Sequence, residues 1–335
     1  MPAVKIVLVG CGMWGRNIAR NLNTLGILAG VADINAENAR RFAAEFDTEV
    51  MTVDEALEKP GHDAIALVTA APSHTDLAVR ALDSGKAVFV EKPLALTVAE
   101  AERIADAAKA AGKPVMVGHL IRHHPVFRHL LTMVEDGAIG TLRHIAARRI
   151  APGRIRDVES VLYDLCPHDL ALIAALTGMA EPDQVACQAI YHVTAGVDDI
   201  ISAQLSFGEG VTATLEANWY NPVKIHQLTV IGSEAALIFD DTRPWPEKLM
   251  RHAFRAGHEA GMVTLERGEA KVIPVPEGEP LREEMANFAD AVAGQTEPLT
   301  GIDEALYVQR IMARMQDAID QSRLSQTKMP QTRML

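Results

Sequence analysis

The sequence has few cysteines, no long apolar segment and no excess of positive charge. Its three cysteines, Cys11, Cys166 and Cys187, are widely spaced and odd in number, which excludes a disulfide framework and a paired-cysteine zinc motif. Such a chain suits a reducing compartment, and we expect a cytoplasmic protein. No stretch approaches the roughly 18 apolar residues that span a bilayer, so we also expect no membrane insertion.

The charge balance argues against polyanionic partners. The chain carries 32 basic and 44 acidic residues, which gives a formal net charge of -12. Proteins that bind nucleic acid need a basic surface to neutralise phosphates, so we expect no nucleic-acid partner. With 335 residues, 48% of them hydrophobic and 23% charged, the sequence is instead typical of a soluble globular protein of about two domains.

Residues 1–120 predict a doubly wound parallel sheet. Short apolar runs alternate there with helical patterns, as expected when crossover helices bury parallel strands on both faces. A capping box at Thr97 and Glu100 begins one helix and Gly112 ends it, while Gly85 is a candidate C-cap of the helix before. The predicted strands cover residues 4–9, 27–32, 64–69, 87–90 and 115–117.

Residues 121–325 predict an α+β domain with a mostly antiparallel sheet, because several long strand candidates alternate polar and apolar residues. Helical spacing returns at 282–293 and 303–322, and these C-terminal helices can pack back on the first domain. Residues 242–280, rich in proline, glycine and charge, are expected to form an irregular connection, and 326–335 a loosely held tail. The strand candidates cover residues 141–150, 184–193, 200–207, 211–220 and 226–240.

Residues 10–15, Gly-Cys-Gly-Met-Trp-Gly, form a G-x-G-x-x-G sequence between a predicted strand and a predicted helix. Gly10 permits a tight turn, Gly12 lets the backbone approach a pyrophosphate, and Gly15 lets helix and strand pack closely. The helix N-terminus attracts the anion. This pattern predicts a dinucleotide site, although a glycine-rich turn without a ligand can share the same spacing.

Asp33 ends the second predicted strand, 18 positions after Gly15 (33 − 15). A carboxylate there accepts hydrogen bonds from the adenosine ribose hydroxyls and repels a 2′-phosphate. The next two residues, Ile34 and Asn35, supply no cation that would offset this repulsion. We therefore expect NAD as the cofactor rather than NADP.

Two further motifs carry groups suited to proton transfer. Lys92 follows the fourth predicted strand, where ligands of open α/β sheets bind, although a lone lysine at a strand end is often only a solvated charge. Asp164 and His168 are four residues apart, which places both side chains on one face of a helix. A structural hydrogen bond to a neighbouring aspartate is the alternative role for His168.

Four motifs occur in order along the chain: Gly10 to Gly15, Ala71-Pro72-Ser73-His74, Glu91-Lys92-Pro93 and Asp164-x-x-x-His168. With them the sequence resembles the Gfo/Idh/MocA oxidoreductases over nearly its whole length. The resemblance implies an N-terminal Rossmann domain, a C-terminal domain with an open, mostly antiparallel sheet, and a homodimer or homotetramer formed through that sheet. It also implies NAD(P)-dependent oxidation of a sugar or cyclitol by Lys92, Asp164 and His168. The implied cofactor-binding residues are Gly10, Gly12, Met13, Trp14, Gly15, Asp33, Ala71, Pro72, His74, Glu91 and Lys92.

The three implied catalytic residues suit alcohol oxidation. Removing hydride from a secondary alcohol requires a base for the hydroxyl proton, and we expect His168 to be that base. Lys92 would polarise the oxygen as it becomes a carbonyl, and Asp164 would orient these groups or the substrate. The roles of Lys92 and His168 can also be exchanged.

The sequence departs from the common family pattern around His168. Cys166 stands where glycine is usual, Ala171 stands where an acidic residue is usual, and Asp169 follows the histidine directly. Cys166 and the histidines of the chain show no close-spaced ligand pairs of the zinc type. We therefore expect no metal.

Residues 119–156 hold seven arginines and five histidines but only two acidic residues. Guanidinium groups bind diphosphate or carboxylate through paired hydrogen bonds, so this stretch predicts an anionic substrate. Internal salt bridges or a subunit interface explain the stretch equally well. The predicted substrate-binding residues are His119, Arg122, Arg154 and Arg156.

Residues 161–178 and 280–306 also resemble the branch of the family that oxidises nucleotide sugars for polysaccharide synthesis. That resemblance implies oxidation at C3 of a UDP-sugar such as UDP-N-acetylglucosamine or its uronate. A neutral cyclitol or free sugar is the alternative substrate. A non-catalytic NAD sensor is the alternative function, because a fold alone does not fix activity.

Overall fold

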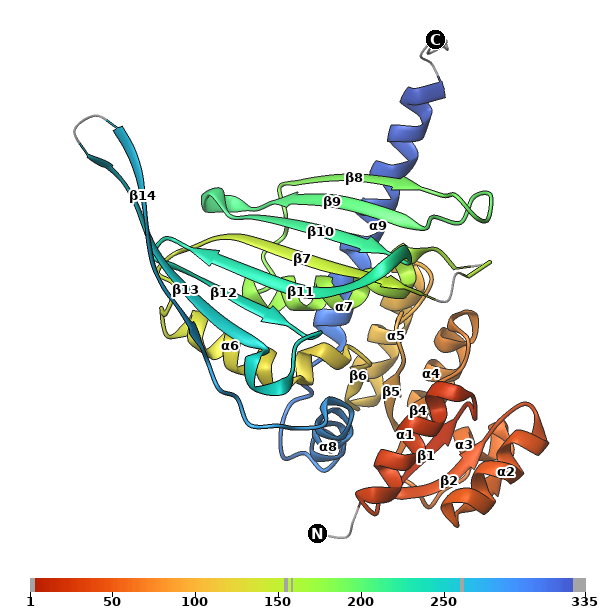
Figure 1. Ribbon diagram of the computed structural model, residues 1–335. Helices are drawn as coiled ribbons and strands as arrows, with labels where there is room; N and C mark the ends of the chain where they lie inside the picture. Colours follow the sequence, from red (N-terminus) through yellow and green to blue (C-terminus); the bar gives the residue numbers. More distant parts are fainter. Residues whose placement is uncertain (1–3, 154–155, 158, 260–261, 328–335) are drawn as a thin grey trace. The chain divides into compact units, whose positions relative to one another are not determined.

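The computed structural model in Figure 1 describes residues 4–153, 156–157, 159–259 and 262–327. The predicted loose tail at 326–335 lies mostly outside these ranges. Within them, no helix is long and apolar enough to cross a membrane.

The chain folds into two compact units. Unit 1 contains Met1–His124 and Gly278–Gln309, and unit 2 contains Pro125–Glu277 and Arg310–Leu335. A segment near the C-terminus, Gly278–Gln309, therefore belongs to the same unit as the first part of the chain.

Unit 1 is built on a six-stranded parallel sheet in the order β3-β2-β1-β4-β5-β6, which is the order of a doubly wound Rossmann sheet. All five predicted strands are present. The structure adds β3, which no apolar run revealed because only one of its three residues is buried. The strands are β1 (Ile6–Val9), β2 (Leu28–Ala32), β3 (Glu49–Met51), β4 (Ala64–Leu67), β5 (Ala87–Val90) and β6 (Val115–Val117).

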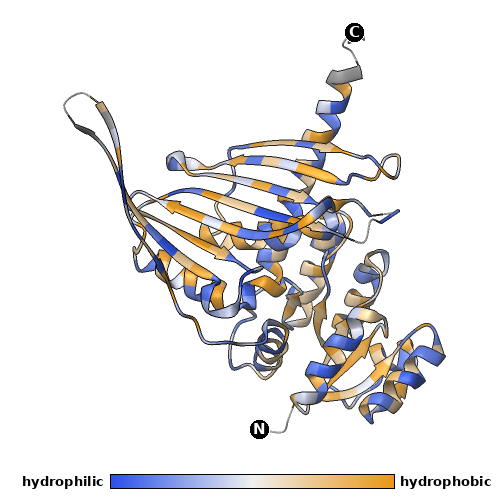
Figure 2. Cartoon of the chain, viewed as in Figure 1, coloured by the Kyte–Doolittle hydropathy of each residue, from blue (hydrophilic) through white to orange (hydrophobic). Residues whose placement is uncertain are grey.

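Helices cover both faces of this sheet. Along β1, Val7 and Val9 pack with α3, α4 and α5, whereas Ile6 and Leu8 pack with α1, α2 and α8. Figure 2 shows the strands of unit 1 as almost wholly hydrophobic, as expected for burial on both sides. The helices are α1 (Met13–Thr24), α2 (Ala36–Phe46), α3 (Val53–Glu58), α4 (His74–Asp83), α5 (Val98–Ala111), α8 (Pro280–Val292) and the first part of α9 (Ile302–Thr327), with 3-10 turns η1 (Ala71–Ser73) and η2 (Leu120–His123).

The helix boundaries of unit 1 follow their capping residues. Thr97 and Glu100 form the predicted capping box before α5, and Gly112 ends that helix in the left-handed conformation at φ 59°. After α4 the C-cap is Ser84, and the predicted Gly85 follows it with φ 76°. These caps fix where each helix returns the chain to the sheet.

Unit 2 is built on an eight-stranded sheet in the order β14-β13-β12-β11-β7-β10-β9-β8. Neighbouring strands are antiparallel except β7 and β10, which are parallel. The prediction of a mostly antiparallel sheet is therefore confirmed. The strands are β7 (Leu142–Pro152), β8 (Gln184–Ile190), β9 (Ile200–Ser206), β10 (Thr212–Asn218), β11 (Tyr220–Gly232), β12 (Ala235–Asp240), β13 (Leu249–Glu259) and β14 (Met262–Val272).

Two predictions about this sheet were wrong. Residues 226–240 form not one strand but parts of two, because a turn at Ser233 and Glu234 separates β11 from β12. Residues 242–280 are not an irregular connection, because most of them form the β13–β14 hairpin that Figure 1 shows as a long ribbon. Exposed charged residues such as Glu266 and Glu269 interrupt its apolar pattern, so no apolar run marked these strands in the sequence.

Unit 2 also contains α6 (Pro125–Glu135), α7 (Val161–Leu176) and the rest of α9, with 3-10 turns η3 (Gly208–Gly210) and η4 (Trp245–Glu247). Helix α7 packs against β7, β9 and β10. Its buried side chains include Cys166 and Leu170, whereas Asp164 and His168 are only half-buried. The predicted helical face thus carries both candidate catalytic residues.

Candidate active site

The glycine loop between β1 and α1 has the shape that its sequence predicts. Gly10 has φ +109°, and a Cβ at this residue would lie 2.4 Å from the carbonyl oxygen of Val68. A Cβ at Gly15 would lie 2.1 Å from the carbonyl oxygen of Gly10. Both distances exclude a side chain, so these glycines allow β1, α1 and the chain after β4 to approach one another.

Gly12 differs from the other two, because a Cβ at this residue would meet no described atom within 4 Å. Gly12 is the N-cap of α1, which has no side-chain cap among the described residues and no acidic residue in its first turn. The helix therefore starts next to a space that no described atom fills, and its first backbone N–H groups lie beside that space. This arrangement fits the pyrophosphate of a dinucleotide.

Asp33 follows β2 and holds the same loop. Its Oδ2 accepts a hydrogen bond from the backbone N–H of Cys11 at 2.6 Å, and its Oδ1 accepts one from Asn35 at 2.7 Å. Each carboxylate oxygen has a second lone pair, so Asp33 can still accept a ribose hydroxyl. Burial, with the negative charge of Asp33, raises the pKa of the Cys11 thiol to about 12.

Glu91 connects the start of α1 to the end of β5. Its Oε1 accepts the indole N–H of Trp14 at 2.5 Å, and its Oε2 accepts the backbone N–H of Lys92 at 3.2 Å. A Cβ at Gly118 would lie 2.9 Å from the same Oε2, so a larger residue at this position would displace the carboxyl group. Burial raises the pKa of Glu91. Lys92 follows directly and is half-buried, while Met13 is 79% exposed at the start of α1.

The Ala71-Pro72-Ser73-His74 motif forms η1 and the first residue of α4. His74 is buried, and its two ring nitrogens contact the backbone carbonyl oxygens of Pro93 and Thr69. Burial lowers the pKa of His74. The expected contact between His74 and the cofactor stays a prediction, whereas its contacts with two loops of the protein are part of the structure.

Two predicted substrate-binding residues of unit 1 share a buried carboxylate. His119 Nδ1 lies 3.2 Å from Glu304 Oε1, and Arg122 Nε donates to Glu304 Oε2 at 2.9 Å. All three side chains are less than a tenth exposed. Sequence reasoning missed Glu304 because it lies 182 residues after Arg122 and no motif connects the two.

In unit 2 the structure brings Arg156 and Asp164 together. The Arg156 guanidinium donates from Nη2 to Asp164 Oδ1 at 2.9 Å and lies 3.6 Å from Glu159. Asp164 is in the first turn of α7, and His168 follows one turn later. Arg156 remains 44% exposed, so it can also meet a ligand. The predicted Arg154 lies outside the described residues.

Asp169 anchors α7 to the sheet. Arg149 on β7 donates from Nε and Nη2 to the two carboxylate oxygens at 2.9 and 2.7 Å, and the side chains are only 12% and 4% exposed. His226 is opposite Arg149 on β11 and lies 3.0 Å from Asp241. Burial and the positive charge of Arg149 lower the pKa of His226. The unusual aspartate after His168 is thus part of a buried ion pair.

The cationic stretch at 119–156 is divided between the two units, because unit 1 ends its first segment at His124. Its arginines pair with carboxylates from several elements. Arg148 on β7, for example, pairs with Glu216 on β10 at 2.9 Å. The arginines paired in this way are Arg122, Arg148, Arg149 and Arg156.

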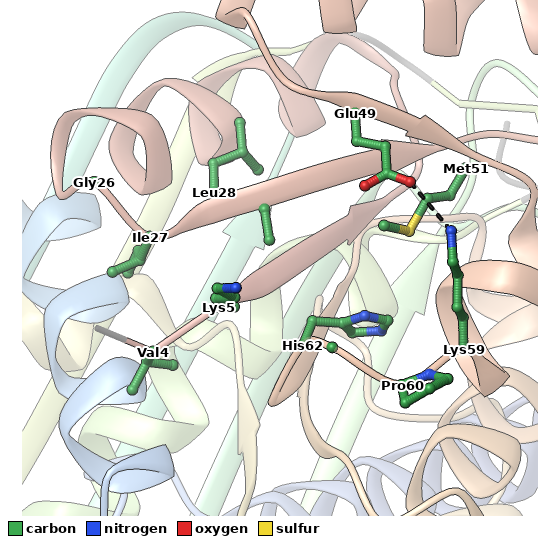
Figure 3. A pocket seen from close by; sticks show the side chains of 12 residues that line it. Val4, Lys5, Gly26, Ile27, Leu28, Glu49, Met51, Lys59, Pro60 and His62 are labelled. Atoms are coloured by element: carbon green, nitrogen blue, oxygen red, sulfur yellow. Dashed lines mark hydrogen bonds and ion pairs between the residues drawn. The ribbon is translucent and has the colours of Figure 1, made fainter. Parts of the chain in front are cut away.

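A pocket of about 340 Å³ lies at the amino ends of β1 and β2 in unit 1. Lys5, Glu49, Lys59 and His62 contribute to its lining, and Figure 3 shows Glu49 and Lys59 joined by an ion pair. The glycine loop and Asp33 lie at the carboxyl ends of the same strands, so the pocket is separate from the dinucleotide loop. No group of three His, Cys, Asp or Glu side chains in the described ranges could hold a metal ion.

The doubly wound sheet and its glycine loop define a dinucleotide-binding unit of the Rossmann class. Residues 4–119 match the family model "Oxidoreductase family, NAD-binding Rossmann fold". Residues 127–238 match the GFO/IDH/MocA C-terminal domain. The chain belongs to the Gfo/Idh/MocA family of oxidoreductases.

Named relatives in this family act on different compounds. The chain is 33% identical over 220 residues to a UDP-N-acetylglucosamine 3-dehydrogenase from Acidithiobacillus ferrooxidans, covering 65% of this chain and 68% of the relative. It is 34% identical over 180 residues to an inositol 2-dehydrogenase from Acidothermus cellulolyticus, covering 51% and 52%. A solved structure of the Acidithiobacillus ferrooxidans enzyme is similar with a TM-score of 0.84 and 26% identity, covering 96% of this chain and 99% of that one.

Proposed function

We propose that this protein is an NAD-dependent dehydrogenase of a UDP-sugar, such as UDP-N-acetylglucosamine or its uronate, and that it oxidises the C3 hydroxyl. The observation that carries the proposal is the pair of Arg156 and Asp164. This pair places a half-exposed guanidinium beside a candidate catalytic carboxylate, and guanidinium groups suit a diphosphate. The likeness to UDP-N-acetylglucosamine 3-dehydrogenase in sequence and fold supports the same substrate class.

The preference for NAD follows from Asp33. Its carboxylate is held by the N–H groups of Cys11 and Asn35, so it cannot easily turn away from a ribose bound at the end of β2. A 2′-phosphate at that place would meet a fixed negative charge. The neighbouring Ile34 is 99% exposed and offers no hydrogen bond to either dinucleotide.

The glycine loop and Asp33 would hold NAD, which would supply the acceptor for the hydride that leaves the sugar carbon. His168 takes the hydroxyl proton as general base, and the ammonium group of Lys92 donates a hydrogen bond to the oxygen as negative charge develops on it. Asp164 holds Arg156 and orients the substrate beside His168. The exchange of roles between Lys92 and His168 is the alternative assignment.

A cyclitol such as inositol is the second candidate substrate, because an inositol 2-dehydrogenase is about as similar in sequence where it aligns. The two candidates differ in charge. Binding of a neutral cyclitol does not require a guanidinium group, whereas the two phosphates of a UDP-sugar need positively charged partners. The arginines of unit 2 therefore distinguish them.

The first experiment measures the absorbance of reduced nicotinamide when the purified protein and NAD are offered UDP-N-acetylglucosamine, its uronate or myo-inositol. Each assay is run with and without a 2-oxo acid that reoxidises tightly held cofactor. We expect turnover of a UDP-sugar only. Turnover of inositol alone would contradict the proposal and favour the second candidate.

Arg156→Ala tests the substrate contact directly. We expect it to raise KM for the UDP-sugar by about tenfold or more, because a charge-assisted hydrogen bond is lost. Arg148→Ala is the matched control, since Arg148 is equally exposed, at 45%, and also pairs with a carboxylate. An equal rise in KM for both variants would show that Arg156 has no particular role in binding the substrate.

A further inference from the structure

His74 connects the two loops that follow β4 and β5. Its ring is 1% exposed, Nδ1 lies 2.8 Å from the carbonyl oxygen of Pro93, and Nε2 lies 3.0 Å from that of Thr69. Thr69 precedes the Ala71-Pro72 turn, and Pro93 directly follows Lys92. One buried side chain therefore contacts the backbone next to a candidate catalytic residue and the backbone of a candidate cofactor loop.

The ring cannot donate to both carbonyls while it is neutral. A carbonyl oxygen only accepts hydrogen bonds, and a neutral imidazole has a single N–H group. Both contacts are hydrogen bonds only in the cationic ring, which burial disfavours. The tautomer of His74 therefore decides which of the two loops receives its hydrogen bond.

The loop after β4 has hydrogen bonds of its own. The hydroxyl groups of Thr69 and Ser73 lie 2.8 Å apart, and Ser73 donates from its backbone N–H and its hydroxyl to Ala70 at 2.9 and 2.8 Å. The contact of His74 with the Thr69 carbonyl is also the longer one, at 3.0 Å, and only part-buried, whereas the contact with the Pro93 carbonyl is buried and 2.8 Å long. At Pro93 a donor from His74 joins the chain after Lys92 to α4, which begins at His74.

We propose that His74, with its proton on Nδ1, donates to the carbonyl of Pro93 and is the positioning residue that fixes Lys92. It acts through the backbone and does not touch the reacting atoms. This inference rests on the proposed function only in giving Lys92 a catalytic role. A displacement of about 1 Å at a catalytic group can lower turnover about a hundredfold, so the effect on the reaction would be large.

Two substitutions separate the two contacts. The amide nitrogen of asparagine can take the place of Nδ1, and that of glutamine can take the place of Nε2. His74→Asn should therefore keep the hydrogen bond to Pro93, and His74→Gln should lose it while keeping that to Thr69. The same pair of substitutions at His62 is the control, because His62 is a mostly buried histidine of unit 1 whose Nε2 contacts the carbonyl of Ala56 at 2.6 Å.

Hydrogen exchange of the free protein is the first measurement, since it needs neither cofactor nor substrate. We expect the amides of residues 94–96 to exchange about tenfold faster in His74→Gln than in His74→Asn, which should match the wild type. Both His62 variants should leave this segment unchanged. Equal exchange in the two His74 variants, or faster exchange in a His62 variant, would overturn the inference.

Turnover of the UDP-sugar is the second measurement. We expect kcat of His74→Gln to fall about 10- to 100-fold below that of His74→Asn. If the wild type turns over no UDP-sugar, the proposed function fails, but the exchange result still decides the role of His74. If the variants do not fold, nitrogen NMR of the wild-type ring decides, because a proton on Nε2 would contradict the assignment.

Discussion

The dinucleotide loop of unit 1 and helix α7 of unit 2 place their functional groups in opposite ways. The loop depends on the absence of side chains, since Gly10 and Gly15 allow close backbone contacts and Gly12 leaves open space. Helix α7 depends on charged side chains, since Arg149 and Arg156 pair with Asp169 and Asp164. A backbone site is thus encoded within a few residues, whereas the ion pairs of α7 need partners that lie outside the helix.

Breaking the ion pair that anchors α7 should have the largest effect on stability. Asp169→Asn leaves the Arg149 guanidinium buried without its carboxylate, which costs about 3–5 kcal/mol in the free energy of unfolding. Urea unfolding of the whole protein measures this loss. The control is Glu216→Gln in the exposed pair with Arg148, where the cost should be at most about 1 kcal/mol. Equal costs for the two variants would contradict the anchoring role.

The difference between these sites also explains what the sequence could reveal. Short apolar runs predicted five of the six strands of unit 1, and the spacing of three glycines predicted the loop, because both patterns lie within a few residues. By contrast, the carboxylates that pair with Arg122 and Arg148 lie far from them in the sequence. Glu304 lies 182 residues from Arg122, and Glu216 lies 68 residues from Arg148, so these two ion pairs could not be predicted from spacing.

His74 and Asp169 show that sequence-based prediction has the same limit even for residues that the sequence identifies. The sequence singled out both residues, His74 as part of a motif and Asp169 as a departure from one. Their contacts depend on tertiary packing: His74 meets the carbonyl of Pro93, and Asp169 meets Arg149 on a strand. A motif can thus identify a residue without revealing which neighbour it holds.

Substitutions of two glycines sharpen the contrast within the loop itself. Gly15→Ala should cost about 1–3 kcal/mol of stability, because its Cβ would overlap the Gly10 carbonyl. Gly12→Ala should leave stability within about 0.5 kcal/mol, since φ is -85° and the Cβ has room. Its Cβ would instead occupy space next to the pyrophosphate, so we expect Kd for NADH to rise about tenfold. Thermal unfolding measures the change in stability of both variants, and a fluorescence titration measures Kd for NADH. An unchanged NADH affinity in Gly12→Ala would argue against the loop as the pyrophosphate site.

A pH-dependent effect is expected at a buried carboxyl group that, unlike Asp169, has no arginine partner among the described residues. Glu284 on α8 is fully buried, and neither of its carboxyl oxygens has a hydrogen-bond partner among the described residues. Burial and the nearby negative charge of Glu91 raise the pKa of Glu284 well above its usual value of 4.5. The folded protein therefore binds more protons than the unfolded chain above about pH 4.5, so this group lowers stability as pH rises through the raised pKa.

Glu284→Met tests this sign. The substitution removes the ionisable group, so at pH 8 the variant should be more stable than the wild type by about 1–3 kcal/mol. The difference should shrink toward pH 5, where the wild-type carboxyl is already protonated in the folded state. Urea unfolding of the whole protein at both pH values measures this difference, and Glu283→Gln, a change at the exposed neighbour, is the control. The prediction fails if the difference in stability between Glu284→Met and the wild type stays constant with pH. Glu284 would then be paired with a cation, as Asp169 is with Arg149, and the contrast between these two buried carboxyl groups would be lost.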